Sequence, residues 1–412
     1  MALDLDFVRS QYPVFNNPET ARWAMFENAG GSYVPHQVID HLHRFFQFTK
    51  VQPYGPYPSS IAAGKSMDAG YQAIAGLLNC HSDELTLGPS TSMNTYVLAQ
   101  AIRPTLKPGD EIIVTNQDHE ANIGCWRRLE EFGAVVKVWR IDPQSGELSL
   151  ENLERLIGSN TRMVCFSLSS NIVGTMNDVE TICSMVHDAG AIAIGDGVSF
   201  APHRLLDVNA SGLDLYLFST YKTFGTHLGV MWGRPAILET LEPQGHYFNR
   251  EIPHYNFNPA GPLHAQIGAL AGLREYIETL YRHHFDEVQP GFYARAARVF
   301  ELFADHETTQ ANRILTAVKA IRGSRIIGQD QALTGSRAPT ISITLEGMSS
   351  GEAVKKLVKK DIAVLNGHFY ARRCVEALGI KDPEDGVIRI SLVHYNSEED
   401  VSRLVEALGE LA

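Results

Sequence analysis

Two polar residues in the middle of the sequence each follow an apolar segment of the kind that forms a β-strand. Asp196 comes directly after the apolar run 191–195, and Lys222 follows the run 213–218 within one turn. Ligands of parallel sheets bind at the carboxyl ends of the strands, so both side chains are expected at one site. A lysine amine can bond a carbonyl carbon, and a carboxylate can keep a ring nitrogen protonated. Each residue alone has a plainer interpretation, because aspartates often cap turns and lysines often lie on the surface.

The elements that would position this pair alternate between strands and helices. Strands are predicted at 111–115, 135–139, 163–167, 191–195, 213–218 and 230–233, with helical patterns such as 150–157 and 179–189 between most of them. Continuous apolar runs separated by helices are typical of a mostly parallel sheet that is covered on both faces. This part of the sequence therefore predicts an α/β fold.

The pattern changes near residue 285. A helix to about 304 is followed by predicted strands at 338–345, 362–365 and 387–391 and by helices at 350–359 and 398–411. With 412 residues, the chain is long enough for two domains. We predict a large domain over 21–284 and a smaller α+β domain formed by 1–20 and 285–412, with the boundary inside a long helix near residue 285.

The segment 191–233 resembles the lysine signature of the cysteine desulfurases and class-V aminotransferases, and the resemblance continues in order from about Met25 to Leu411. The matching residues are Asp196-Gly197, Pro202-His203, Ser219-Thr220-Tyr221-Lys222 and Gly225-Thr226-His227-Leu228-Gly229. The resemblance implies the fold of the type I aminotransferases and pyridoxal 5'-phosphate as cofactor. It also implies that Lys222 bonds the cofactor and moves the substrate's α-proton, while Asp196 holds the ring nitrogen protonated.

The resemblance assigns further cofactor contacts. His119 would stack on the cofactor ring and relay protons, although a histidine after a strand can also be structural. The remaining implied contacts, to the phosphate or the phenolic oxygen, are Ser90, Thr91, Asn171, Ser199, Ser219, Tyr221 and, from a partner subunit, Gly261. A phosphate suits the start of the helix after Ser90, where free N–H groups point outward. A plain helix cap by Ser90 or Thr91 and a turn role for Asn171 are the alternatives.

The substrate contacts follow from the same resemblance. Arg389, in the strand 387–391, would grip the substrate carboxylate through two parallel hydrogen bonds, unless it is a solvent-facing residue of an alternating strand. The turn Asn28, Ala29 and Gly30 would border the substrate, and His368 would lie beside it. The tyrosines of segment 53–59 would shape a substrate pocket or belong to an ordinary Pro-rich loop.

The loop 365–371 departs from the family. Cysteine desulfurases use a nucleophilic cysteine here, whereas this chain has Tyr370. Cys374, four residues on, is either an ordinary cysteine or a displaced nucleophile. We therefore predict a cysteine-desulfurase-like lyase that lacks the usual nucleophile and cleaves a bond at the β-position of a small amino acid. The alternatives are a class-V aminotransferase, an epimerase, or a non-catalytic binding protein of the same fold.

Composition excludes several other classes of function. The net charge of −12 makes nucleic acid and anionic membranes poor partners, and no run of about 18 apolar residues predicts a membrane span. The five cysteines form no CxxC pair, so neither a metal site nor a disulfide framework is expected. We expect a cytoplasmic homodimer, which the family implies, with an unidentified sulfur acceptor if it transfers sulfur.

Overall fold

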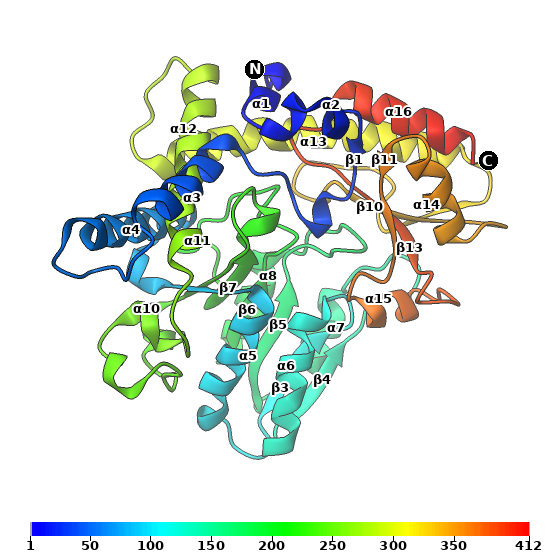
Figure 1. Ribbon diagram of the computed structural model, residues 1–412. Helices are drawn as coiled ribbons and strands as arrows, with labels where there is room; N and C mark the ends of the chain where they lie inside the picture. The colour runs from blue at the N-terminus through cyan, green and yellow to red at the C-terminus, as the bar shows by residue number, and fades with distance from the viewer. Residues whose placement is uncertain (1, 412) are drawn as a thin grey trace.

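The computed structural model describes residues 2–411, and the largest feature of this part of the chain is a seven-stranded sheet (Figure 1). The strand order is β2-β8-β7-β6-β5-β3-β4. Among these strands β8 alone runs opposite to the others. The strands are β2 (Leu85–Gly88), β3 (Glu111–Thr115), β4 (Val135–Trp139), β5 (Thr161–Ser167), β6 (Ile192–Asp196), β7 (Leu215–Ser219) and β8 (Gly229–Gly233). The predicted α/β fold with a mostly parallel sheet is confirmed.

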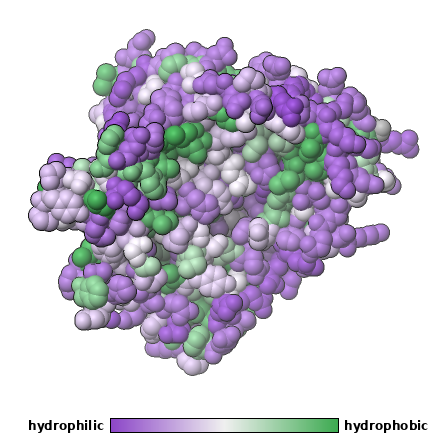
Figure 2. Space-filling view, viewed as in Figure 1, coloured by the Kyte–Doolittle hydropathy of each residue, from purple (hydrophilic) through white to green (hydrophobic). Residues whose placement is uncertain are grey.

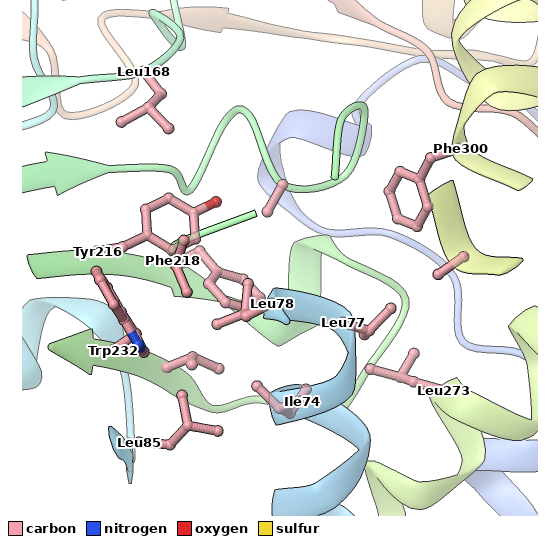
Figure 3. Close-up of a cluster of buried hydrophobic side chains, with 14 of the residues drawn as sticks. Ile74, Leu77, Leu78, Leu85, Leu168, Tyr216, Phe218, Trp232, Leu273 and Phe300 are labelled. Carbon is pink, nitrogen blue, oxygen red and sulfur yellow. The ribbon is translucent and has the colours of Figure 1, made fainter. Parts of the chain in front are cut away.

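Both faces of this sheet are covered, because successive side chains of one strand enter different cores. In β7, Tyr216 and Phe218 join the core beneath α4, whereas Leu215 and Leu217 join the core of the opposite face. Figure 3 shows the first of these cores, where β7 and β8 meet residues of α4 such as Ile74 and Leu78. The helices of this region are α3 (His36–Phe48), α4 (Pro58–Leu78), α5 (Thr91–Ile102), α6 (Gly124–Arg127), α7 (Leu150–Leu156), α8 (Val179–Asp188), α9 (Pro235–Leu238), α10 (Pro253–Asn256), α11 (His264–Ala269) and α12 (Ala271–His284).

A second, four-stranded antiparallel sheet has the order β12-β13-β10-β9 and a hydrophobic core of its own. Beside it, the short strand β1 near the N-terminus pairs in parallel with β11. The strands are β1 (Ala24–Met25), β9 (Ser324–Ile327), β10 (Thr340–Leu345), β11 (Ile362–Ala363), β12 (Leu365–Gly367) and β13 (Val387–Ser391). The helices are α1 (Leu5–Ser10), α2 (Pro18–Ala21), α13 (Phe292–Ala320), α14 (Ser350–Val358), α15 (Arg372–Ala377) and α16 (Glu398–Gly409).

The prediction that a helix continues through residue 285 is wrong, and the position of the domain boundary stays a prediction. α12 ends at His284 and α13 begins only at Phe292. The segment between them contains Pro290 and Gly291, and Gly291 has φ +79°, which a helix cannot contain. The strand β1, which the prediction placed in the large domain, pairs with the C-terminal region instead. The rest of the predicted division stays a prediction.

The surface is largely hydrophilic, with apolar patches around α3 and around the smaller sheet (Figure 2). On α3, the side chains of Phe46 and Phe48 are 52% and 69% exposed, and Tyr57 and Ile61 at the start of α4 are also exposed. Between residues 2 and 411, no helix combines the length and the apolar character that crossing a membrane requires.

Candidate active site

A cavity of about 380 Å³ opens at the edge of the large sheet where β3, β5, β6 and β7 end. The carboxyl end of β2 lies at the same edge, because β2 and β7 both pair antiparallel to β8. The cavity therefore collects residues that are far apart in the sequence. Its lining is Ser90, Thr91, Ser92, His119, Ala121, Ser167, Ser169, Asn171, Asp196, Val198, Ser199, Ser219, Tyr221, Lys222, His227 and Tyr370.

Lys222 lies where the chain leaves β7 in a single 3-10 turn. Its side chain is buried, and burial, followed by the positive charge of Arg389, lowers the pKa of its amine to about 8. Asp196 partly offsets this by raising the pKa. About a tenth of the amine is therefore unprotonated at pH 7, far more than at its ordinary pKa, and this is the form that attacks a carbonyl carbon.

Asp196 is the last residue of β6, and its Oδ1 accepts a hydrogen bond from the N–H of Val198 at 2.8 Å. Burial is the main reason that the pKa of this carboxyl is raised to about 7; the hydrogen bond from Val198 lowers the pKa, Asp118 raises it and Lys222 lowers it. A carboxylate in such a place is costly without a cation beside it. The carboxyl of Asp196 is therefore suited to bind a protonated ring nitrogen, because that positive charge would keep the carboxyl ionised.

His119 follows β3 and points into the same cavity. Its Nδ1 accepts a hydrogen bond from the N–H of Ala121 at 3.0 Å, so the proton of the neutral ring is on Nε2. Burial lowers the pKa of His119 to about 4, and Lys222 and Arg389 contribute in the same direction. The ring is therefore neutral at pH 7 and able to stack on a flat, electron-poor ligand. The ring of Tyr370 lies 5.3 Å from it, centroid to centroid.

The lining of the cavity is rich in hydroxyl groups where α5 begins. Ser90 caps this helix by accepting the N–H of Met93 at 3.1 Å. The Oγ1 of Thr91 lies 2.7 Å from the Oγ of Ser219, which ties the helix to the end of β7. Gly229 allows this approach, because a Cβ there would lie 2.2 Å from the backbone carbon of Ser90. Hydroxyls and free N–H groups at a helix N-terminus can bind a phosphate.

Arg389, in β13, is not among the residues that line the cavity, but its charge contributes to lowering the pKa values of Lys222 and His119. Its Nη2 donates to Oε1 of Glu27 at 2.6 Å, and the ring of Phe369 lies 3.7 Å from its guanidinium carbon. The amide of Asn171 donates to the carbonyl of Phe369 at 2.9 Å, which connects the cavity wall to the loop that covers Arg389. The alternative that Arg389 faces solvent is wrong, since it is only 3% exposed.

Other predicted site residues lie outside the cavity lining. The side chain of Asn28 is buried and donates to Met25, Ser391 and Asn396, so only its backbone is left for a substrate. The N–H of Ala29 donates to Ser391 as well. These contacts pin the turn to the end of β13.

Gly30, His368 and Gly261 also fall outside the lining. Gly30 lies against Glu27, while His368 accepts from the N–H of Tyr370 and faces Glu384 at 3.7 Å. Gly261 lines two neighbouring cavities, so its predicted phosphate contact requires a second chain.

The cysteines are separate from the cavity. Cys374 is 0% exposed within an apolar cluster, and burial raises the pKa of its thiol to about 12. Among residues 2–411 the cavity lining contains no cysteine. Tyr370 instead enters the cavity from the loop before α15, with φ +59°, and its carbonyl accepts the N–H of Glu120 at 2.8 Å. This backbone conformation is uncommon for a residue other than glycine and is found at functional sites.

Several residues of the site were not predicted from the sequence. His227 lies inside the matching segment 225–229 and Ser92 directly follows the predicted Thr91, so their positions were a usable signal, and the ring of His227 stacks on Tyr221 at 4.5 Å. Ser167 is the last residue of β5 and Ser169 follows two residues later, at the same strand-end position that pointed to Asp196 and Lys222. Nothing in the local sequence pointed to Glu27, because its role depends on its contact with Arg389, 362 residues away.

The residues of this cavity fit pyridoxal phosphate. Hydroxyls at the start of α5 suit the phosphate, Asp196 suits the ring nitrogen, and the buried amine of Lys222 suits the aldehyde carbon. The Oγ of Ser169 is buried and has no hydrogen-bond partner within the described chain, which leaves a polar atom for a bound group.

Comparisons with known proteins agree with this geometry. The sequence model of the family Aminotransferase class-V matches residues 24–404. The aminotransferase-like protein FGM3 of Gibberella zeae is 33% identical over 416 residues, which cover 99% of this chain and 98% of that protein. The cysteine desulfurase-like protein ustD of Aspergillus flavus is 28% identical, covering 99% and 91%. The cysteine desulfurase CsdA of Escherichia coli has the same fold, with a TM-score of 0.83 at 22% identity over 100% of this chain and 98% of that one.

Proposed function

The chain belongs to the aminotransferase class-V family, whose cofactor is pyridoxal phosphate, and from this premise we propose that it is a lyase that cleaves a bond at the β-position of an amino acid without a protein thiol. The observation that carries the proposal is the loop before α15. It brings Tyr370 to His119 in the cavity, while Cys374 is buried elsewhere. A persulfide needs an accessible thiolate, and burial opposes its formation at Cys374.

The bound cofactor supplies an electron-withdrawing ring on which charge from the substrate's α-carbon can be delocalised. We propose that Lys222 Nζ removes the α-proton, because burial brings its pKa to about 8, close to working pH. Asp196 holds the proton on the ring nitrogen, and the neutral ring of His119 stacks on the cofactor. Arg389 orients the substrate through its carboxylate.

We propose that the serine, threonine and tyrosine hydroxyls at the start of α5 and the end of β7 hold the phosphate. Ser90, Thr91, Ser219 and Tyr221 all line that end of the cavity. Asn171 and Ser199 also line the cavity, and we propose that they contribute to orienting the ring. Closure of the cavity by the loop that carries Tyr370 would keep water from the reacting carbon.

A homodimer is part of the proposal. Gly261 lines two cavities outside the active site, together with Tyr54 in one and Met93 in the other. Exposed apolar side chains of α3 and α4, such as Phe48 and Ile61, add to this surface. Burial of such side chains favours association with a second copy.

The test is to incubate the purified, cofactor-loaded protein with L-cysteine and a panel of β-substituted amino acids, and to measure alanine, keto acid, ammonia and sulfide. Alanine formation indicates that the β-substituent departs as an electrophile, whereas pyruvate with ammonia indicates elimination. Both support a lyase. Keto acid with pyridoxamine phosphate after a single turnover would support the aminotransferase alternative instead.

The matched variants are Cys374→Ala and Tyr370→Phe. We expect Cys374→Ala to leave product formation unchanged, because that thiol does not line the cavity. Loss of activity in this variant, with the cofactor still bound, would contradict the proposal and indicate a persulfide route. Lys222→Ala is the control that should abolish turnover in every case.

A further inference from the structure

One of the two cavities that Gly261 lines has a volume of about 740 Å³ and combines aromatic rings with a single carboxylate. It lies between α4 and the segment around α10, which are on the same side of the molecule in Figure 1. The carboxylate is that of Asp68, and no lysine or arginine among residues 2–411 lines the cavity. The aromatic residues of the lining are Tyr54, Tyr71, Tyr255, His254 and His264. The proposed reaction uses none of these side chains.

Tyr54 is held at this cavity in a conformation that its own backbone disfavours. Its φ of +67° is uncommon for a residue other than glycine, and such conformations are found at functional sites. Its hydroxyl donates to Oδ1 of Asp68 at 2.9 Å. Gly64 in α4 gives the ring its room, because a Cβ there would lie 2.7 Å from Cδ1 of Tyr54. The ring of Tyr54 therefore stays against α4, beside the carboxylate.

Tyr71 lines the cavity three residues after Asp68 on the same helix. It is buried, and the ring of His254 lies 4.1 Å from its ring, centroid to centroid, with the two planes 31° apart. Nδ1 of His254 lies 3.4 Å from the carbonyl oxygen of Leu85, which ties this wall to β2. Burial raises the pKa of both Tyr54 and Tyr71, so their hydroxyls stay protonated at pH 7.

The charge of the lining favours a positively charged ligand. Burial, followed by the positive charge of Lys50, lowers the pKa of His264, so this ring is neutral at pH 7. The faces of aromatic rings are negative and attract cations, and the carboxylate of Asp68 adds to this attraction. A divalent metal ion would require several oxygen ligands, and no cluster of three metal-binding side chains occurs among residues 2–411. The lining therefore fits an organic cation, which has apolar surface as well as charge.

We propose that this cavity binds an organic cation of the alkylammonium class, with Asp68 as its counter-charge and the rings of Tyr54 and Tyr71 beside it. Two sources share this chemistry: the far end of the amino-acid substrate, and a separate small molecule. The first would require the proposed homodimer, in which Gly261 brings the cavity to the partner's active site. The binding itself needs only residues of one chain.

The probe is choline, a quaternary ammonium ion that has no N–H and so cannot bond the aldehyde of the cofactor. Its uncharged analogue of the same shape is 3,3-dimethyl-1-butanol. The dissociation constants of both are measured by calorimetry on the cofactor-loaded protein. We expect choline to bind at least about tenfold more tightly than the alcohol, because only choline gains from the carboxylate and the ring faces.

Two variants separate the charge from the ring. Asp68→Asn should weaken choline binding at least about threefold and leave the binding of the alcohol unchanged, because only the charge is lost. Gly64→Ala should weaken choline binding by about the same factor while it keeps every charge, since the new Cβ displaces the ring of Tyr54. The matched control is Asp188→Asn, an exposed carboxylate of α8, which should bind choline as the parent protein does.

No binding of choline, equal affinity for choline and the alcohol, or an unchanged affinity in Asp68→Asn would overturn the inference. If Asp68→Asn fails to fold, as judged by thermal unfolding, Gly64→Ala still decides, because alanine suits the interior of a helix better than glycine. The binding measurement needs no turnover, so failure of the proposed function shows separately, as an absence of product.

A kinetic measurement distinguishes the two sources of the cation. Choline that raises the KM of the amino acid and leaves kcat unchanged would support the inference with the substrate as the source. Choline that binds but leaves KM unchanged would support it with a separate ligand.

Discussion

Replacement of Asp196 by asparagine should stabilise the cofactor-free protein and at the same time impair the enzyme. The pKa of this carboxyl rises from 3.8 to about 7 in the folded chain, chiefly through burial. At about 1.4 kcal/mol for each tenfold change in proton affinity, the ionised carboxylate destabilises the fold by about 4 kcal/mol. Asparagine carries no charge, so it removes the cost of burying a carboxylate, and it keeps an oxygen that can accept a hydrogen bond from the N–H of Val198.

The gain in stability from Asp196→Asn should depend on pH. Because the pKa is raised in the folded state, the carboxyl does not destabilise the fold below about pH 4, where it is protonated in both the folded and the unfolded chain. Its contribution to the free energy of unfolding is then lost as the pH rises through about 7. The gain from Asp196→Asn should therefore be near its full value of about 4 kcal/mol at pH 8 and less than about half of that at pH 5. Turnover of the loaded enzyme should fall by roughly 100-fold or more, since the ring nitrogen loses its ionised partner.

The assay is urea unfolding of the cofactor-free protein at pH 5 and pH 8, with the exposed Asp286→Asn as matched control. Equal stability of the parent and Asp196→Asn at pH 8, or a gain that does not change between the two pH values, would refute the reasoning. Either result would mean that water or local rearrangement keeps the carboxylate solvated. A gain of similar size in the control would refute it too.

Three more predictions concern Lys222, Gly229 and the buried thiol of Cys374. The rate at which the cofactor-free protein bonds pyridoxal phosphate, followed by absorbance, should rise with pH, reach half of its maximum near pH 8 and level off about one pH unit higher, as the amine of Lys222 loses its proton; a rise that continues to pH 10 would contradict its lowered pKa. Gly229→Ala should weaken cofactor affinity at least about tenfold, since its Cβ would lie 2.2 Å from the backbone of Ser90, whereas Gly409→Ala, with open space around it, should not. Cys374→Ala should lower the free energy of unfolding by about 1 kcal/mol in urea unfolding and leave the pKa values of the rate profile unmoved; a changed profile would assign the thiol a role.

Much of the fold was predictable because its elements are local. The strand 387–391 coincides with β13, and the predicted strand 213–218 differs from β7 only at its ends. The four-residue strands β2 and β9 were missed, because such short segments carry little periodicity. The error near residue 285 arose from continuing one helical pattern across Pro290 and Gly291.

The sequence by itself determined the chemistry that depends on residue type and order along the chain: Lys222 and Asp196 after successive strands, the family, and hence the cofactor. Tertiary structure decided which protonation states and partners these residues have. Burial gives His119 a neutral ring, withholds Cys374 from the cavity and lets Glu27 reach Arg389 across 362 residues. These properties depend on desolvation and on charges that folding brings close together. Neither the burial of a residue nor its distant neighbours can be inferred from the local sequence.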